Sequence, residues 1–271
     1  MPRPEIVPDA PLTPFERTVL SVCRFANTHP LPKAAQRAYQ RYVGGPFVRE
    51  VVGKRLHVEG LEAAAALDPP AGVLLCTNHR SFFDQFIVAS VLEPAVRWMR
   101  RLYFPVRSNY FYETWGGFAV NAIVGGLVMY PPVFRQAKKS NWNKAALDEI
   151  AAFLAEKGAV VGMHPEGTRG KGPDPYELLP AQPGVGQVIM RARPTVVPVW
   201  INGMSNDFVH EVSARFRGGA PIFVLFGPPV DFGTLLDGTP RPAQYKRVAD
   251  HVRAAIIRLG ERERNLRALV R

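Results

Sequence analysis

Residues 72–92 read GVLLCTNHRSFFDQFIVASVL, and this stretch decides the fold. It opens with GVLLCT (72–77), a short continuous apolar run that is typical of a buried strand. It closes with SFFDQFIVASVL (81–92), which predicts a helix. A buried strand that leads directly into a helix indicates an α/β protein, and it places the polar residues between them at the carboxyl end of the strand.

The same alternation of strands and helices continues along the chain. Further helices are expected at 141–158 and 241–269, and further strands at 55–60, within 95–104, and at 159–163, 195–201 and 221–227. We therefore expect an α/β domain over residues 51–271, with a mixed central sheet flanked by helices and a C-terminal helix.

An N-terminal helical hairpin is expected over residues 1–50. In its first helix, 12–27, one face carries an apolar stripe made of Phe15, Val19, Val22, Cys23 and Ala26. A proline-containing break, HPLPK, separates it from a second, more basic helix at 33–43, where Lys33, Arg37 and Arg41 recur at helical spacing. Such a hairpin can pack on the domain, as is common in soluble proteins, or it can dock on a membrane surface.

Composition and charge limit the classes of partner. The apolar fraction of 47% is enough for a sizeable core, and the net charge of +11 favours anionic partners such as phospholipid surfaces or phosphorylated substrates. No helix-turn-helix or RNA-binding aromatic motif stands out, so we expect no nucleic acid partner. The longest apolar stretch, 118–129, is short of the ~20 residues that span a bilayer.

The two cysteines, Cys23 and Cys76, belong to no metal-binding or disulfide pattern. The opening residues also lack the apolar core of a signal peptide. We therefore expect a cytoplasmic protein, peripheral on the inner face of the cell membrane.

The polar segment after the first buried strand, Asn78–Asp84, contains the first candidate site. His79 is expected in the connection and Asp84 in the first helical turn, so the carboxylate can fold back onto the imidazole. The other ring nitrogen is then free to take a proton from a substrate hydroxyl, and no nucleophilic side chain is required. Ser81-x-x-Asp84 also matches a helix capping box, and taken alone this spacing favours that structural interpretation.

A second polar segment, His164–Arg169 (HPEGTR), follows the strand at 159–163. Gly167 permits a tight turn with positive φ, and Arg169 could hold a phosphate in a bidentate manner. The alternative is an exposed polar turn in which Glu166 and Arg169 form a surface ion pair of little energetic value.

Together, NHxxxxD at 78–84 and PEGTR at 165–169 resemble the glycerolipid acyltransferase family, whose best-known members are 1-acylglycerol-3-phosphate acyltransferases. The resemblance covers about residues 55–230. It implies that His79 is the general base, that Asp84 is its orienting partner, and that the acceptor phosphate is bound by Glu166, Gly167, Thr168 and Arg169. Glu166 is expected to orient Arg169 and backbone amides, because two anions repel each other.

The chain also departs from the family pattern. His164 stands where a phenylalanine is usual, and Pro131 and Pro132 stand where the second block of the family carries an arginine. Arg135 follows three residues later and is the remaining candidate for that substrate contact. The later block at 181–184, AQPG, lacks the usual lysine.

The resemblance implies transfer of a fatty acyl group from acyl-CoA or acyl-carrier protein to a hydroxyl of a lysophospholipid, with 1-acylglycerol-3-phosphate as the expected acceptor. It implies no metal and no cofactor beyond the acyl donor as co-substrate. Two alternatives remain open: a metal-dependent hydrolase using His79, Asp84, His164 and Glu166, and a non-catalytic basic lipid-binding protein.

Overall fold

The protein is built around a six-stranded mixed sheet. The computed structural model describes residues 12–134, 136 and 139–270. The spatial strand order is β1-β8-β7-β2-β6-β3, and neighbouring strands are parallel except for β7 and β8. The strands are β1 (Leu56–Glu59), β2 (Val73–Thr77), β3 (Arg101–Tyr103), β6 (Ala159–Met163), β7 (Thr195–Asn202) and β8 (Ile222–Phe226). This arrangement confirms the expected mixed α/β fold and supplies the strand order, which the sequence does not contain.

Strand β2 lies at the centre of the sheet, between β6 and β7. All five of its residues are buried, as its continuous apolar pattern predicts. The parallel register pairs Cys76 with Met163 on β6 and with Pro198 on β7. The carboxyl ends of the three strands therefore meet at one edge of the sheet, which brings the two polar segments together.

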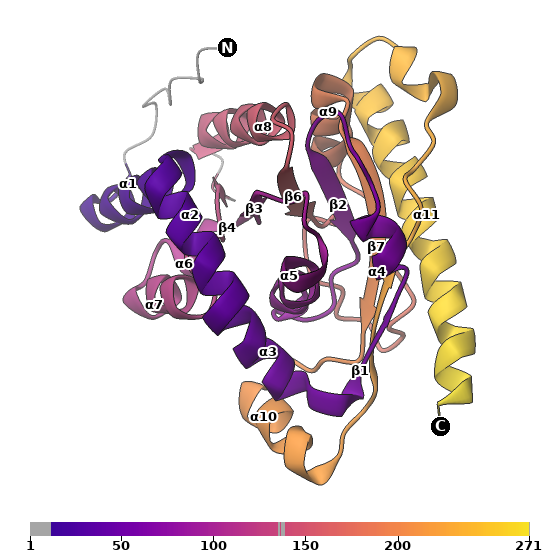
Figure 1. Ribbon diagram of the computed structural model, residues 1–271. Helices are drawn as coiled ribbons and strands as arrows, with labels where there is room; N and C mark the ends of the chain where they lie inside the picture. The colour runs from indigo at the N-terminus through magenta and orange to yellow at the C-terminus, as the bar shows by residue number, and fades with distance from the viewer. Residues whose placement is uncertain (1–11, 135, 137–138, 271) are drawn as a thin grey trace.

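Helices cover both faces of the sheet (Figure 1). On one face, α8 (Ser140–Leu154), α9 (Pro183–Ala192) and α11 (Pro242–Leu269) pack against each other and the strands. On the other face lies α5 (Asp84–Ala95), which begins later than expected, so residues 81–83 belong to the connection. Helix α9 was not predicted, because Pro183, Gly184 and Gly186 are typical of a turn. Gly186 instead allows close packing: a Cβ there would lie 1.9 Å from the carbonyl oxygen of Tyr245 on α11.

The N-terminal segment forms α1 (Pro14–Thr28), α2 (Pro30–Tyr39), a π-helical turn (Gln40–Gly44) and α3 (Gly45–Val52). A capping box between Thr13 and Glu16 starts α1. The prolines of HPLPK lie in the first turn of α2, where a missing N–H group costs nothing, so this helix begins earlier than expected. From Pro30 to Val52 the helical turns are continuous, and they cross the boundary expected at residue 50.

These helices share the core of the domain. Val19 and Cys23 are buried in it, whereas Val22 from the same expected stripe is 43% exposed. Asn27 donates to the Leu127 carbonyl oxygen at 2.7 Å, and Lys33 donates to that of Leu102 at 2.6 Å. The stripe on α1 is therefore largely a packing surface.

Two short strands and several short helices complete the fold. Strand β4 (Val106–Arg107) pairs in parallel with β5 (Pro132–Val133), and short helices lie at 61–65 (α4), 108–111 (α6), 115–123 (α7) and 208–217 (α10). Within the described ranges, no helix combines the length and apolarity needed to cross a bilayer.

Candidate active site

The two predicted motifs meet at the carboxyl ends of β2 and β6. His79 follows β2 directly, and Asp84 is the first residue of α5. The Nδ1 atom of His79 lies 3.1 Å from Oδ2 of Asp84, which leaves Nε2 as the other ring nitrogen. His79 also lines a cavity of about 330 Å³ beside this edge of the sheet. The geometry therefore provides the imidazole–carboxylate pair that the spacing predicts.

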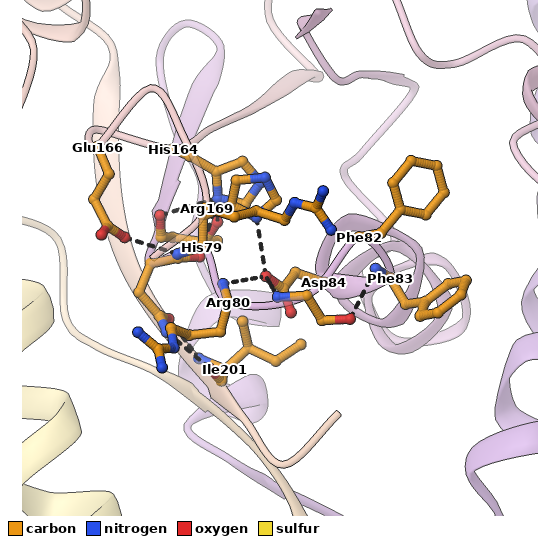
Figure 2. A network of polar contacts seen from close by, with 12 residues as sticks. His79, Arg80, Phe82, Phe83, Asp84, His164, Glu166, Arg169 and Ile201 are labelled. Carbon is orange, nitrogen blue, oxygen red and sulfur yellow. Dashed lines mark hydrogen bonds and ion pairs between the residues drawn. The ribbon is translucent and has the colours of Figure 1, made fainter. Parts of the chain in front are cut away.

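The carboxylate of Asp84 does more than hold the imidazole. Its Oδ2 atom also accepts hydrogen bonds from the backbone amides of Arg80 and Ser81, each at 2.8 Å (Figure 2). Of the two hydrogen bonds that define a capping box, the one from the backbone amide of Ser81 to the carboxylate of Asp84 is thus present. The Ser81 hydroxyl group instead donates to the carbonyl oxygen of Ser205 and accepts from the amide of Phe83. One oxygen atom of Asp84 therefore makes both the contact with the helix start and the contact with the imidazole.

Burial sets the protonation of this pair. It raises the pKa of Asp84 to about 6, against which the hydrogen bonds from Ser81 and Arg80 act. Burial lowers the pKa of His79 to about 3, and the positive charges of Arg169 and Arg107 act in the same direction. At neutral pH the imidazole is therefore unprotonated and able to accept a proton, while the carboxylate is ionised.

His164, the departure from the family pattern, stacks on His79. The ring centroids are 3.8 Å apart and the planes are inclined by 8°. Its Nδ1 atom lies 3.0 Å from the carbonyl oxygen of Asn78 and 3.2 Å from that of Thr77. The polar atom closest to Nδ1 is the hydroxyl oxygen of Thr77, at 2.7 Å, which can donate or accept a hydrogen bond. Burial also lowers the pKa of His164 to about 3, so His79 packs against a neutral aromatic ring.

Glu166 ties the two motifs together through their backbones. Its side chain is buried; Oε1 accepts from the amide of His79 and Oε2 from the amide of Leu179, each at 2.8 Å. Burial raises the pKa of this carboxyl group, and the two amides act against that rise. The expected contact with backbone amides is present, whereas the guanidinium of Arg169 has other partners.

Arg169 is held by residues that sequence reasoning missed. It donates to Oδ1 of Asn206 at 2.7 Å and to the hydroxyl group of Tyr110 at 3.4 Å. The same Asn206 oxygen accepts from the amide of Phe82 at 2.9 Å. The loop after β7 therefore fixes both motifs, and nothing in the local sequence around Asn206 indicates this contact.

Arg107 is a second cation that sequence reasoning missed. Pairing of β4 with β5 sets it opposite Val133, and it donates to the carbonyl oxygen of Gly167 at 2.9 Å. Gly167 adopts φ of +64°, as the expected turn requires. Thr168 is half-buried in the same turn. Arg135 lies outside the described residues, and its contact with substrate stays a prediction.

The cavity beside His79 has a mixed lining. Arg107, Tyr110 and Arg169 contribute polar and charged side chains, and Phe82 and Phe86 contribute apolar ones. The same two phenylalanines also line a neighbouring, wholly apolar cavity of about 360 Å³ between α3, α5, α7 and α10. The two cavities together offer both cationic and apolar lining residues.

The four residues considered as metal ligands are engaged in contacts with one another or with the backbone. The Nδ1 atom of His164 faces backbone carbonyl groups, and both carboxylate oxygens of Glu166 are occupied by amides. In the part of the chain that the structure describes, no group of three or more His, Cys, Asp or Glu side chains is arranged to hold a metal ion.

Fold and site together define the class: an α/β protein with a histidine–carboxylate pair at the carboxyl edge of a mixed sheet. The model of the acyltransferase family matches residues 55–202, more than half of the chain. The chain belongs to the acyltransferase family, which confirms the resemblance seen in its motifs.

A solved structure shares the fold. The crystal structure of the 1-acyl-sn-glycerophosphate (LPA) acyltransferase PlsC from Thermotoga maritima superposes with a TM-score of 0.53 and 18% sequence identity. The match covers 90% of this chain and 88% of that one. Comparison with curated protein sequences gives no significant match.

The protonation of the pair predicts a pH profile. As pH falls through about 6, Asp84 gains a proton and can no longer stabilise an imidazolium, so kcat/KM for acyl transfer should fall below that pH and stay level above about pH 7. Asparagine does not titrate, so Asp84→Asn should have a lower rate and lose this acid limb. An unchanged limb near pH 6 in the variant would show that another group is responsible.

Proposed function

We propose that this protein transfers a fatty acyl group from acyl-CoA or acyl-carrier protein to a hydroxyl group of a lysophospholipid, 1-acylglycerol-3-phosphate in the first instance, during phospholipid biosynthesis. The observation that carries the proposal is the His79–Asp84 pair, at 3.1 Å, on a cavity lined by both cations and phenylalanines. The likeness in fold to a protein described as an LPA acyltransferase supports it.

The reaction follows from the geometry of the pair. The acceptor hydroxyl attacks the thioester carbonyl carbon while His79 removes its proton, so a C–O bond forms and a tetrahedral intermediate develops. Asp84 stabilises the imidazolium. When the C–S bond breaks, the proton passes from His79 to the departing sulfur, which yields the ester and the free thiol and regenerates the base.

Two cations can hold the acceptor phosphate. Arg169 and Arg107 both line the reaction cavity, and both act on the pKa of His79, so their charges lie close to the reacting hydroxyl. Guanidinium groups bind phosphate oxygens in a planar, bidentate manner. The apolar cavity shared by Phe82 and Phe86 is suited to an acyl chain.

A lipid acceptor requires the protein to work at a membrane surface, and we assign docking to the N-terminal helices and α7. They expose large apolar side chains: Phe25, Leu31, Tyr42, Val43, Trp115 and Ile123. Trp115 packs on Phe15 of α1, and the hydroxyl group of Tyr39 contacts the carbonyl oxygen of Ile123, so these elements are neighbours. Arg17 of α1 and Arg41 of the π-helical turn are exposed and add attraction to anionic lipids, which fits the inner face of the cell membrane.

Removal of the imidazole tests the base. His79→Ala should reduce thioester-dependent acyl transfer on the order of 10²–10⁴-fold while the circular dichroism spectrum is retained, because His79 lies in a connection. Asp84→Asn should lose less. His251→Ala, which changes an exposed histidine on α11, is the matched control and should keep its activity. Turnover near the unsubstituted level in His79→Ala would refute the assignment.

Arg169 tests the acceptor site. Arg169→Ala should raise KM for 1-acylglycerol-3-phosphate roughly tenfold or more, and raise KM for the acyl donor much less, because a charge-assisted contact to phosphate is lost. Arg262→Ala removes a cation that pairs with Glu59 far from the site and serves as the control. A rise confined to the donor KM would instead assign Arg169 to the carrier.

Point substitutions test docking, because α1 shares the core and cannot be deleted without exposing it. Trp115→Ser combined with Ile123→Ser should lower co-sedimentation with phosphatidylglycerol vesicles, while turnover of a soluble short-chain acceptor is kept. Salt should weaken binding of the unsubstituted protein. Leu269→Ser, an equally exposed position on α11, is the control. Equal vesicle binding by the double variant would move docking to another surface.

A further inference from the structure

A second, polar cavity lies beyond Arg169. It measures about 560 Å³, and its charged lining residues are three cations, Arg80, Arg169 and Lys171, together with the side-chain amides of Asn202 and Asn206. These residues come from the loops that follow β2, β6 and β7, at the edge of the sheet where open α/β folds bind phosphorylated ligands. Arg169 also lines the cavity of His79, so the two cavities share a wall.

The backbone amide and the guanidinium group of Arg80 make contacts on different sides of the site. Its backbone amide donates to Asp84, whereas its guanidinium donates to the carbonyl oxygen of Gly172 at 2.6 Å. The guanidinium also lies so close to Gly170 that a Cβ there would meet it at 2.7 Å. The positive charge of Arg80 is therefore directed toward the 170–172 segment and the polar cavity.

The covalent structure of the substrates decides which phosphate each cavity can receive. In the proposed acceptor, the phosphate is on the carbon next to the one bearing the reacting hydroxyl, so it must lie beside His79, where Arg107 and Arg169 are. In the acyl donor, the whole pantetheine arm separates the thioester from its phosphate. That phosphate must therefore lie farther from His79, on the outer side of Arg169.

Resting on the function proposed above, we propose that this outer cavity, through Arg80 and Lys171, binds the phosphate attached to the pantetheine arm of the acyl donor. Coenzyme A and acyl-carrier protein share this chemistry. Arg80 and Lys171, together with the side-chain amides of Asn202 and Asn206, supply the positive charge and the hydrogen-bond donors that a phosphate requires. The loop of the first motif thus separates the substrates, with His79 facing the reacting groups and the Arg80 guanidinium facing the carrier.

The test compares donors with and without phosphate. For Lys171→Gln and Lys171→Glu, the ratio of kcat/KM for hexadecanoyl-CoA to that for hexadecanoyl-pantetheine, which has no phosphate, should fall about threefold and about tenfold, respectively. KM for the lysophospholipid acceptor should not follow this change. Lys157→Gln is the matched control, because this exposed lysine pairs with Asp68 at the opposite end of the sheet and should leave the ratio unchanged.

Further measurements distinguish the possible sources of the bound phosphate, and they distinguish failure of this proposal from failure of the proposed function. An equal loss with hexadecanoyl-acyl-carrier protein supports recognition of the shared phosphate, and a loss with the coenzyme A donor alone supports recognition of the nucleotide phosphates in the same cavity. An unchanged donor ratio in both Lys171 variants and in Arg80→Gln, or a rise in the acceptor KM alone, overturns the proposal. Absence of acyl transfer by the unsubstituted protein with all three donors would instead refute the proposed function.

Discussion

The parallel pairing of β2 with β6 and β7 is the constraint on which the site depends. Parallel strands end at one edge, so the register that sets Cys76 beside Met163 also brings the loop containing His79 to the loop containing Glu166. Asn78 reinforces this arrangement, since its side chain is fully buried and exchanges two hydrogen bonds, each 2.8 Å, with the backbone of Ile201 on β7. The sheet therefore positions the three loops, and the contacts of Asn206 link them to one another.

Burial has different consequences for the two carboxylates of the site, Glu166 and Asp84. Glu166 is buried and each of its carboxylate oxygens accepts a hydrogen bond from a backbone amide, so it links the two loops. Asp84 is equally buried, yet one of its three donors is the ring of His79. The burial that raises the pKa of Asp84 also keeps His79 unprotonated, and a neutral imidazole beside an ionised carboxylate is the arrangement that general-base chemistry requires.

The short loop from His79 to Asp84 divides apolar from charged surroundings. Arg80 lines the polar outer cavity, whereas Phe82 lines both the cavity beside His79 and the neighbouring apolar cavity. Cavities with apolar and with cationic lining thus adjoin one short loop. Large aromatic and aliphatic side chains of α1, α2 and α7 are also exposed at the surface.

The sequence by itself determined the α/β class, most strand and helix positions, and the pairing of His79 with Asp84, because these depend on local periodicity and on residues five positions apart. It did not determine the strand order, helix α9, or the roles of Arg107 and Asn206. Those residues acquire partners 60 and 37 positions away through strand pairing and loop packing. Only the tertiary structure decided that most of the stripe on α1 packs into the core while one of its members, Val22, faces outward. The periodicity of a sequence shows that a helix has an apolar face, whereas the burial of each residue depends on which surfaces pack together.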